Sequence, residues 1–323
     1  MKKFILSLLT IYLFIPISVF AYSDYLMASG QNIGIELKSD YVLVVGSYKI
    51  DDYNVLMETD LKIGDKITKI NNTRVSSIVE MQKVINQDED MVIDVTYNRG
   101  NKEYQEEISI FMENGEYKTG LYVRDMIRGV ATLTYIDVDN KTFGALGHEI
   151  VEKTTKSKFD SSDGTIFAST VTGIIKSNNG NPGEKNARSD SSMVYGVVEE
   201  NTEAGIFGTY TKSLPNNKLY KVASPSEIKQ GSAKILTVIE DDKVEEFDIN
   251  ILRINENSKS KNILFEVTDS DLLEKTGGII QGMSGSPIIQ GDYIVGAVNF
   301  VLVDSPNKGY GIFITNMLDE AEN

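Results

Sequence analysis

The sequence predicts a mostly β protein in two parts, a small α+β domain followed by a larger domain that forms a β-barrel. The chain has 323 residues, which is long enough for two domains. Short runs that alternate apolar and polar residues recur along most of it, with turn residues between them. A hydrophobic content of 41% and a charged content of 24% are typical of a globular protein with a sizeable core.

The residue counts exclude several classes of site. The chain has no Cys, which removes disulfides, thiolate nucleophiles and Cys-based zinc centres, and its one His excludes sites that need two imidazoles. The 32 basic and 47 acidic residues give a net charge of −15, which disfavours contact with phosphate backbones. We therefore expect no metal, no other cofactor and no nucleic-acid partner.

Residues 1–21 read as an export signal. Met1-Lys2-Lys3 is a short basic segment, residues 4–20 are almost continuously apolar, and Val19-Phe20-Ala21 has the small residues that a signal peptidase requires. The apolar stretch is at the short edge of a membrane span and contains Pro16. The segment therefore predicts a signal peptide or an N-terminal anchor, and the rest of the chain is expected outside the cytoplasm.

Residues 25–112 are predicted to form the small α+β domain. In the run from Leu61 to Val75, Gly64-Asp65 reads as a turn, Ile67 to Ile70 as a strand, and Asn71-Asn72 as a tight turn. Ser77 followed by Glu80 is a capping pattern, and the apolar residues behind it are at helical spacing, which predicts one helix of about three turns. Alternating strands on each side of a turn at 98–101 complete the domain.

This domain resembles a PDZ domain through its Leu-x-x-Gly-Asp-x-Ile-x-x-Ile-Asn pattern at 61–71 and the helix that follows. PDZ domains add an extended peptide to a strand and hold its terminal carboxylate on a loop of backbone amides. The resemblance implies that this loop is Gly30 to Ile35, with Ile33, Gly34 and Ile35 nearest to the peptide. The alternative is a β-rich spacer that binds no ligand.

Residues 113–323 contain many short β-like runs separated by turn signals, as in an all-β barrel or sandwich. The polar segment from Ser177 to Ser191 contains Gly and Pro and is predicted to be an exposed mobile loop.

The run Gly282-Met283-Ser284-Gly285 has the form of a nucleophile turn. A catalytic serine needs an exposed oxygen, and small neighbours permit the tight backbone that aims its own amide at the developing oxyanion. Gly282 and Ser284 would supply the two oxyanion amides. Ser286 is the alternative nucleophile, although Pro287 restricts its backbone.

His148 is the only conventional base available to such a serine, because the chain has no other His. Imidazole suits the role because its pKa is ordinarily near 6.5. A third group would orient the imidazole, and the residues alone leave that acid open among Asp269, Asp271, Asp137 and Asp190.

Three segments together resemble the sporulation stage IV protein B peptidases, which are PDZ-bearing serine peptidases of spore-forming Firmicutes. They are Gly-Ala-Leu-Gly-His at 144–148, the long run Val-Thr-Asp-x-x-Leu-Leu-x-x-Thr-Gly-Gly-Ile-x-Gln-Gly-Met-Ser-Gly-Ser-Pro-Ile-Ile-Gln at 267–290, and the tail at 296–314. The resemblance implies a chymotrypsin-like barrel with His148 as base, Asp269 as acid and Ser284 as nucleophile. Two positions depart from the family pattern, since Glu149 replaces an expected Gly and Asn299-Phe300 replaces Thr-His.

The same resemblance implies a role in sporulation signalling. Family members are secreted into the space between mother cell and forespore, cleave a membrane-embedded regulatory complex, and so activate a late sigma factor; they also cleave themselves near the N-terminus. A protein substrate and a peptide ligand of the PDZ domain are therefore the expected partners. The alternatives are a binding scaffold with an inactive peptidase domain and an extracytoplasmic quality-control protease.

Overall fold

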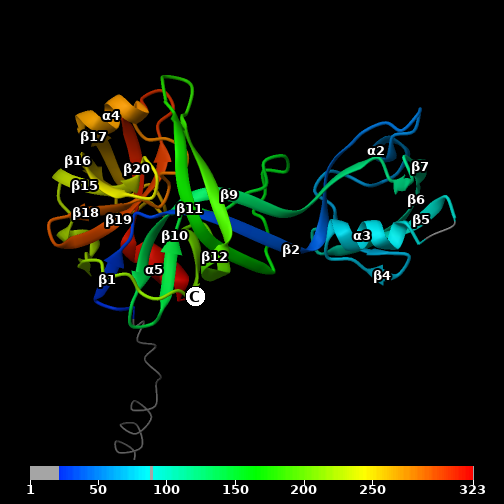
Figure 1. Cartoon of the computed structure of the whole chain (residues 1–323), viewed down its shortest axis with the longest axis horizontal. Helices are drawn as coiled ribbons and strands as arrows, with labels where there is room; N and C mark the ends of the chain where they lie inside the picture. Colours follow the sequence, from blue (N-terminus) through cyan, green and yellow to red (C-terminus); the bar gives the residue numbers. More distant parts are fainter. Residues whose placement is uncertain (1–21, 88–89, 323) are drawn as a thin grey trace, which may run out of the picture.

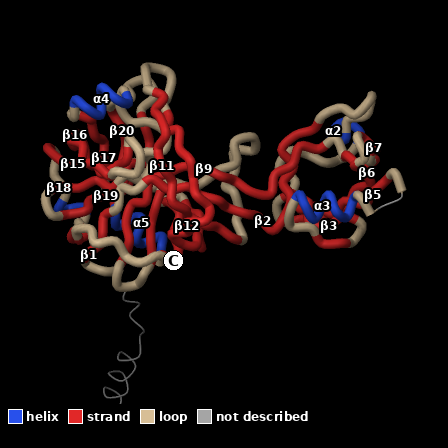
Figure 2. The backbone as a smooth tube through the Cα atoms, viewed as in Figure 1, coloured by secondary structure: helices blue, strands red, loops and turns tan. Residues whose placement is uncertain are grey.

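The protein is described by a computed structural model over residues 22–87 and 90–322. It consists of two lobes joined by two long strands, β2 (Asn32–Ser47) and β9 (Leu121–Asp137), which run side by side from one lobe to the other (Figure 1). We call residues 40–125 the small lobe and residues 22–39 and 126–322 the barrel lobe. Strands dominate both lobes (Figure 2), which confirms the predicted mostly β fold class. The predicted export signal, residues 1–21, lies outside the described residues.

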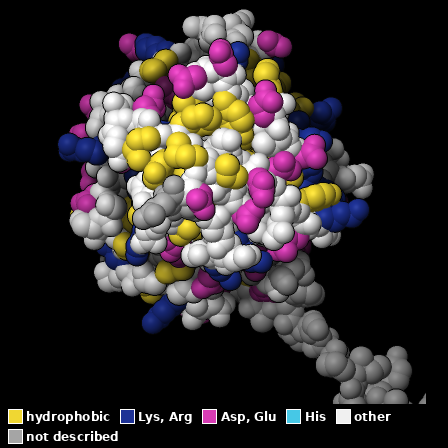
Figure 3. Space-filling view, turned by 90° about the vertical axis from the view of Figure 1, so that its right-hand side faces the viewer, with side chains coloured by type: hydrophobic (Ala, Val, Ile, Leu, Met, Phe, Trp, Pro, Cys, Tyr) yellow, Lys and Arg dark blue, Asp and Glu magenta, His cyan; other side chains and the backbone are white. Residues whose placement is uncertain are grey.

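The small lobe is an α+β unit around its own apolar core. Its elements between the two long strands are α2 (Val55–Glu58), β3 (Lys66–Ile70), β4 (Thr73–Arg74), α3 (Ile78–Ile85), β5 (Val92–Arg99), β6 (Lys102–Ser109), β7 (Phe111–Glu113) and β8 (Glu116–Lys118). The predicted helix is present as α3, although its 8 residues make about two turns rather than three, and the Ser77 side chain caps it by accepting from the Glu80 N–H. Met81 and Ile85 of α3 are buried in this core. Figure 3 shows hydrophobic side chains exposed on one face of the molecule. Met57 and Met112 are two exposed hydrophobic residues of this lobe.

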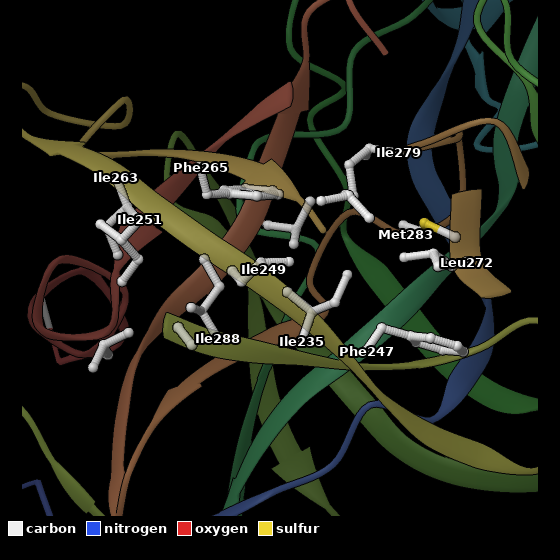
Figure 4. Packing of buried hydrophobic residues seen from close by; sticks show 14 of the residues in the cluster. Ile235, Phe247, Ile249, Ile251, Ile263, Phe265, Leu272, Ile279, Met283 and Ile288 are labelled. Carbon is white, nitrogen blue, oxygen red and sulfur yellow. The ribbon is translucent and has the colours of Figure 1, made fainter. Parts of the chain in front are cut away.

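The barrel lobe contains the remaining elements, whose strands form a closed arrangement. They are β1 (Tyr25–Ala28), β10 (Thr142–Ala145), β11 (Asp163–Ile175), β12 (Glu184–Thr202), β13 (Gly205–Tyr210), β14 (Leu219–Val222), the 3-10 turn η1 (Pro225–Glu227), β15 (Gly231–Val238), β16 (Val244–Ile254), β17 (Ile263–Val267), α4 (Ser270–Thr276), β18 (Pro287–Gln290), β19 (Tyr293–Val301), β20 (Lys308–Phe313) and α5 (Ile314–Ala321). One apolar core lies among β2 and β9–β13 and another among β15–β20. Figure 4 shows Ile235, Phe247 and Phe265 packing in the second.

The small lobe is an insertion into the barrel lobe rather than a domain that precedes it. Strand β1 pairs with β9 and β14, and residues 32–38 of β2 pair with both β9 and β11. The chain therefore completes two barrel strands before it enters the small lobe, and it returns along β9. The predicted boundaries, 25–112 and 113–323, miss this because each long strand is shared by both lobes.

The predicted carboxylate-binding loop is wrong for Ile33, Gly34 and Ile35. All three lie within β2, which pairs with β9 on one side and β11 on the other, so their backbone amides face neighbouring strands. Ile33 and Ile35 are buried, which explains the alternation seen in the sequence. A Cβ on Gly34 would clash with the Ser189 Oγ, so the glycine permits close strand packing.

The predicted mobile loop at 177–191 is in large part a strand. β12 begins at Glu184 and pairs with β11, and Lys185 is buried. The base of this hairpin contacts the segment before Ser284, because the Lys185 N–H donates to the Gln281 carbonyl at 3.0 Å and the Gln281 N–H donates to the Gly183 carbonyl at 2.8 Å. Tertiary pairing thus orders a polar sequence that would be unstructured in isolation.

Among the described residues, no helix has the length and apolar character needed to span a membrane.

Candidate active site

The segment that carries Ser284 is a tight turn between α4 and β18. Gly282 and Gly285 both have left-handed backbone, with φ of 94° and 93°. A Cβ on Gly285 would clash with the Thr132 carbonyl oxygen and come within 2.5 Å of the Leu146 nitrogen. The glycine therefore lets the turn lie directly against the backbone two residues before His148.

This turn is fixed between β9 and β19. The Ser284 carbonyl accepts from the Thr132 N–H at 3.0 Å, and the Thr132 hydroxyl donates to the Gly282 carbonyl at 2.9 Å. On the other side, the Gly285 N–H donates to the Val298 carbonyl at 2.7 Å. Sequence reasoning did not identify Thr132, because a threonine in a strand carries no signal for contact with a turn 150 residues away.

Two backbone donors of the turn are unused. Within the described residues, neither the Gly282 N–H nor the Ser284 N–H donates to a protein acceptor, whereas the N–H of Met283 between them donates to the Ile280 carbonyl at 3.1 Å. Met283 itself is buried in the core of β15–β20. Buried packing of the central residue holds the two flanking amides in place, as an oxyanion site requires.

His148 follows β10 and is half-buried beside the same turn. Its Nδ1 lies 2.9 Å from the Glu149 carbonyl oxygen. Because a carbonyl oxygen only accepts, this bond places the proton on Nδ1 and leaves Nε2 free to accept one. The imidazole stacks on Phe300 with ring centroids 5.7 Å apart and an interplanar angle of 17°. Burial lowers the pKa of His148 below its usual 6.5.

Ser284 and His148 lie against consecutive residues of β19 without a hydrogen bond between them. The Ser284 hydroxyl donates to the Asn299 carbonyl at 3.3 Å, while the next residue, Phe300, stacks on the imidazole. Catalytic hydrogen bonds are often loose in ligand-free enzymes and tighten when substrate binds.

Asp269 caps helix α4 and has no hydrogen bond with His148. Its carboxylate accepts from the N–H groups of Asp271 and Leu272, both at 3.0 Å, and from that of Asp248 at 3.3 Å. Two of the other aspartates considered for the acid also have different partners. Asp137 accepts from Ser23 and Asn140, and Asp190 accepts from Ser192. No carboxylate of the described residues hydrogen-bonds to His148.

Ser286 is fully buried, and its hydroxyl lies 3.5 Å from the Thr132 hydroxyl. A buried hydroxyl that faces β9 has no access to a substrate carbonyl, so Ser286 is not placed to act as the nucleophile.

Lys185 lies directly behind Gly282 and was not identified from the sequence. A Cβ on Gly282 would come within 3.1–3.2 Å of its aliphatic chain, and its ammonium group donates to the Thr237 hydroxyl at 3.0 Å. Burial lowers the pKa of Lys185 to about 7, since no carboxylate compensates the lost hydration. A lysine in a polar run predicts a solvated surface, and only the β11–β12 pairing buries it.

A cavity of about 490 Å³ opens beside His148. Its lining is mostly apolar and includes Ile127, Val130, Ile150 and Phe300 together with the imidazole. Such a cavity accommodates apolar side chains of an extended peptide. Within the described residues, no group of three or more His, Asp and Glu side chains is arranged to hold a metal ion.

A glycine turn with two unused amides, a serine at its tip and a nearby half-buried imidazole define the class of serine peptidase sites. The comparison with known families agrees, because the family model of the SpoIVB peptidase S55 family matches residues 115–318. The chain therefore belongs to the SpoIVB peptidase S55 family.

Solved structures give distant similarities. The PDZ domain of an SdrC-like protein from Listeria monocytogenes is 23% identical, covers 26% of this chain and 87% of its own, with a TM-score of 0.22. The Rv3671c protease from M. tuberculosis, in its inactive form, is 13% identical over 59% of this chain and 84% of its own, with a TM-score of 0.33. No curated protein sequence matches the chain.

Proposed function

We propose that the protein is a serine endopeptidase in which Ser284 is the nucleophile and His148 the general base. The observation that carries this proposal is the turn at 282–285: the amides of Gly282 and Ser284 are unused, and the Ser284 hydroxyl contacts Asn299, the residue before the Phe300 ring that stacks on the only imidazole of the chain. Membership of a peptidase family supports the same reading.

In the proposed reaction, each of these groups has a role in acyl transfer. Ser284 Oγ attacks the peptide carbonyl while Nε2 of His148 takes its proton, and the amides of Gly282 and Ser284 stabilise the oxyanion. The imidazolium then gives the proton to the leaving amine. A water molecule activated by the same imidazole cleaves the acyl-enzyme and regenerates the serine.

The imidazole is oriented by a backbone carbonyl in this structure. In serine peptidases the acid of the triad fixes the tautomer of the histidine. Here the Glu149 carbonyl accepts from Nδ1, whereas the carboxylate of Asp269 is engaged with three backbone amides. We therefore assign the orienting role to Glu149 and a positioning role to Asp269, in place of the expected His148, Asp269 and Ser284 triad.

The family supports a biological setting for this activity. We propose regulated cleavage of a membrane-associated regulatory protein during sporulation signalling, outside the cytoplasm between mother cell and forespore, with self-cleavage near the N-terminus. The apolar cavity beside His148 suits a protein substrate that presents an extended apolar segment.

A fluorophosphonate probe tests the catalytic assignment. We expect wild-type protein to gain one probe mass, Ser284→Ala to gain none, and Ser286→Ala, the matched control from the same turn, to label like wild type. Labelling of Ser284→Ala would overturn the assignment. A folded wild-type protein that neither labels nor cleaves any peptide would favour a binding scaffold instead.

A further inference from the structure

Strand β9 presents one open edge that runs from the candidate active site into the small lobe. Residues 121–131 pair with β2 alone, whereas Thr132 also bonds with Ser284 and Leu146, and β1 and β10 pair with β9 only from residue 133 onward. In Figure 1 the strand passes without interruption between the lobes. An unpaired strand edge is a template for an extended peptide.

The open edge at the active site faces the cavity beside His148. The Thr132 N–H and C=O point away from β2, because they bond with Ser284 and Leu146. Backbone groups alternate between the two edges of a strand, so those of Val130 and Arg128 face the same side as those of Thr132. Both residues also line the cavity that contains His148.

The mechanism gives the direction in which a substrate lies on this edge. His148 donates its proton to the leaving amine, so the part of the substrate after the scissile bond lies on the His148 side, in that cavity. Beyond Thr132 the edge is open only toward lower residue numbers. A substrate therefore extends antiparallel to β9, with its C-terminal part directed toward the small lobe.

The small-lobe end of the same edge lies beside a helix and begins at a glycine turn. The N–H and C=O of Val44 bond with Asp65 and Gly64, so Val123, which is opposite Val44, also turns its backbone groups away from β2. Helix α3 lies along this part of β9, and its Ile78 N–H donates to the Asp125 carboxylate at 2.8 Å. Gly120, with φ of 74°, forms the turn that precedes the strand. A strand edge beside a helix and after a glycine turn is the arrangement with which PDZ domains bind C-terminal carboxylates.

We propose that β9 binds the C-terminal tail of a substrate protein along its whole open edge. The tail carboxylate lies at the turn of Thr119 to Leu121, where it replaces the Thr119 hydroxyl as acceptor for the Leu121 N–H, and the scissile bond lies at Ser284. Each residue of one antiparallel strand faces one residue of the other, so the cut falls about ten residues before the C-terminus. The inference rests on the proposed peptidase function, and it names the substrate class as proteins with a free, extended C-terminal tail.

The occupant is a partner's tail rather than the last helix of this chain. Met317 and Leu318 of α5 are buried in the barrel lobe, where the helix contacts β19 and β20. The apolar lining by Ile127 and Val130 further predicts apolar side chains in the tail residues just after the scissile bond.

Peptides with nested C-terminal ends test the proposal on wild-type protein. One apolar sequence is extended stepwise at its C-terminus, and the cut is located by mass spectrometry. We expect the cut to move with the terminus and stay about ten residues from it. We also expect C-terminal amidation to lower kcat/KM at least tenfold through KM. A cut that keeps its place in the sequence, or an amide that changes nothing, would overturn the proposal while the Ser284-dependent cleavage itself keeps the peptidase function intact.

Two proline variants distinguish the roles of the two ends of the open β9 edge. Neither N–H faces β2, so Val123→Pro and Val130→Pro leave the ladder with β2 in place. Val123→Pro is expected to abolish the dependence on the C-terminus while short peptides are still cleaved, and Val130→Pro to slow cleavage of both. A Val123→Pro variant that slows cleavage of short peptides as much as that of long tails would contradict the proposal.

N-methylated peptides probe the same bonds without a protein variant. Methylation at alternate positions should slow cleavage, with the alternation interrupted once, because the β2–β9 register shifts between Lys38 and Leu43. Uniform insensitivity to methylation would count against an added strand. Failure of all cleavage and of probe labelling would instead reject the proposed function.

Discussion

At the scale of single residues, the imidazole of His148 sets the acidic limit of activity. Burial lowers its pKa, and the general base must be neutral, so activity falls only when the pH drops below that lowered value. We expect the acidic midpoint of kcat/KM to lie below pH 6.5. The Phe300 ring that covers the imidazole contributes to this burial.

The variant Phe300→Ala exposes the imidazole to water and should move that midpoint upward, toward 6.5. Phe300→Tyr keeps the stacked ring and should restore the wild-type profile. The pH dependence of kcat/KM measures both. An unchanged midpoint in Phe300→Ala would show that the stack does not control the base.

Lys185 is a second residue whose titration has a measurable consequence. Its pKa is about 7 in the fold and 10.5 when unfolded, so between these values the unfolded chain binds more protons and the free energy of unfolding rises with pH. Lys185→Met removes the buried amine and should raise the free energy of unfolding at pH 7 by on the order of 2 kcal/mol.

Urea unfolding at pH 7 and pH 10 checks this prediction, because the gain of Lys185→Met should shrink at the higher pH. Lys176→Met, at an exposed position just after β11, is the control and should change little. A gain of equal size at both pH values would indicate that packing, and not the charge, is responsible.

At the scale of elements, Asp269 is the clearest case of a residue whose role depends on its helix. The carboxylate caps α4, which leads into the turn of Ser284. Asp269→Ala should cost about 1 kcal/mol of unfolding free energy, whereas Asp269→Asn retains a good cap and should cost little. Kinetics of the two variants separate the cap from a catalytic acid. Asp269→Asn should keep kcat within about tenfold, whereas loss of an orienting acid lowers kcat by about 10⁴.

The elements also show what sequence patterns reveal and what they omit. The capped helix α3, the turn at Ser284 and its two amides follow from local rules, because glycines and capping residues act on their own neighbours. The alternation at Ile33 and Ile35 correctly indicated a strand. The two strands that occupy its edges, β9 and β11, are distant in sequence and were not foreseen. Because both edges are paired, the peptide-binding role assigned to this strand was wrong. The burial of Lys185 and the contacts of Thr132 with the serine turn could not be predicted for the same reason.

At the scale of the whole molecule, the two lobes are coupled through β2, β9 and the segment after His148. Glu152 of that segment is buried, and its carboxylate lies 3.3 Å from the guanidinium group of Arg124 in the small lobe. Lys66 of the small lobe pairs with Asp160 of the barrel lobe. Two ion pairs therefore connect the small lobe with the segment that follows His148.

The insertion also determines how the lobes can be separated. Deleting residues 22–112 would remove β1 and the part of β2 that the barrel lobe needs, so that variant should not fold.

Lys38 and Met126 are opposite each other in the β2–β9 pair, so a short glycine-containing turn can join them in place of residues 39–125. We expect this shortened protein to unfold cooperatively on heating and to keep probe labelling at Ser284, because the turn at 282–285 is held by Thr132 and Val298 of the barrel lobe. It should cleave short peptides, but the position of the cut should no longer depend on the substrate's C-terminus, because the end of the β9 edge that binds the carboxylate has been removed. A folded shortened protein that still cuts about ten residues from each terminus would place the recognition of the terminus within the barrel lobe and not along β9.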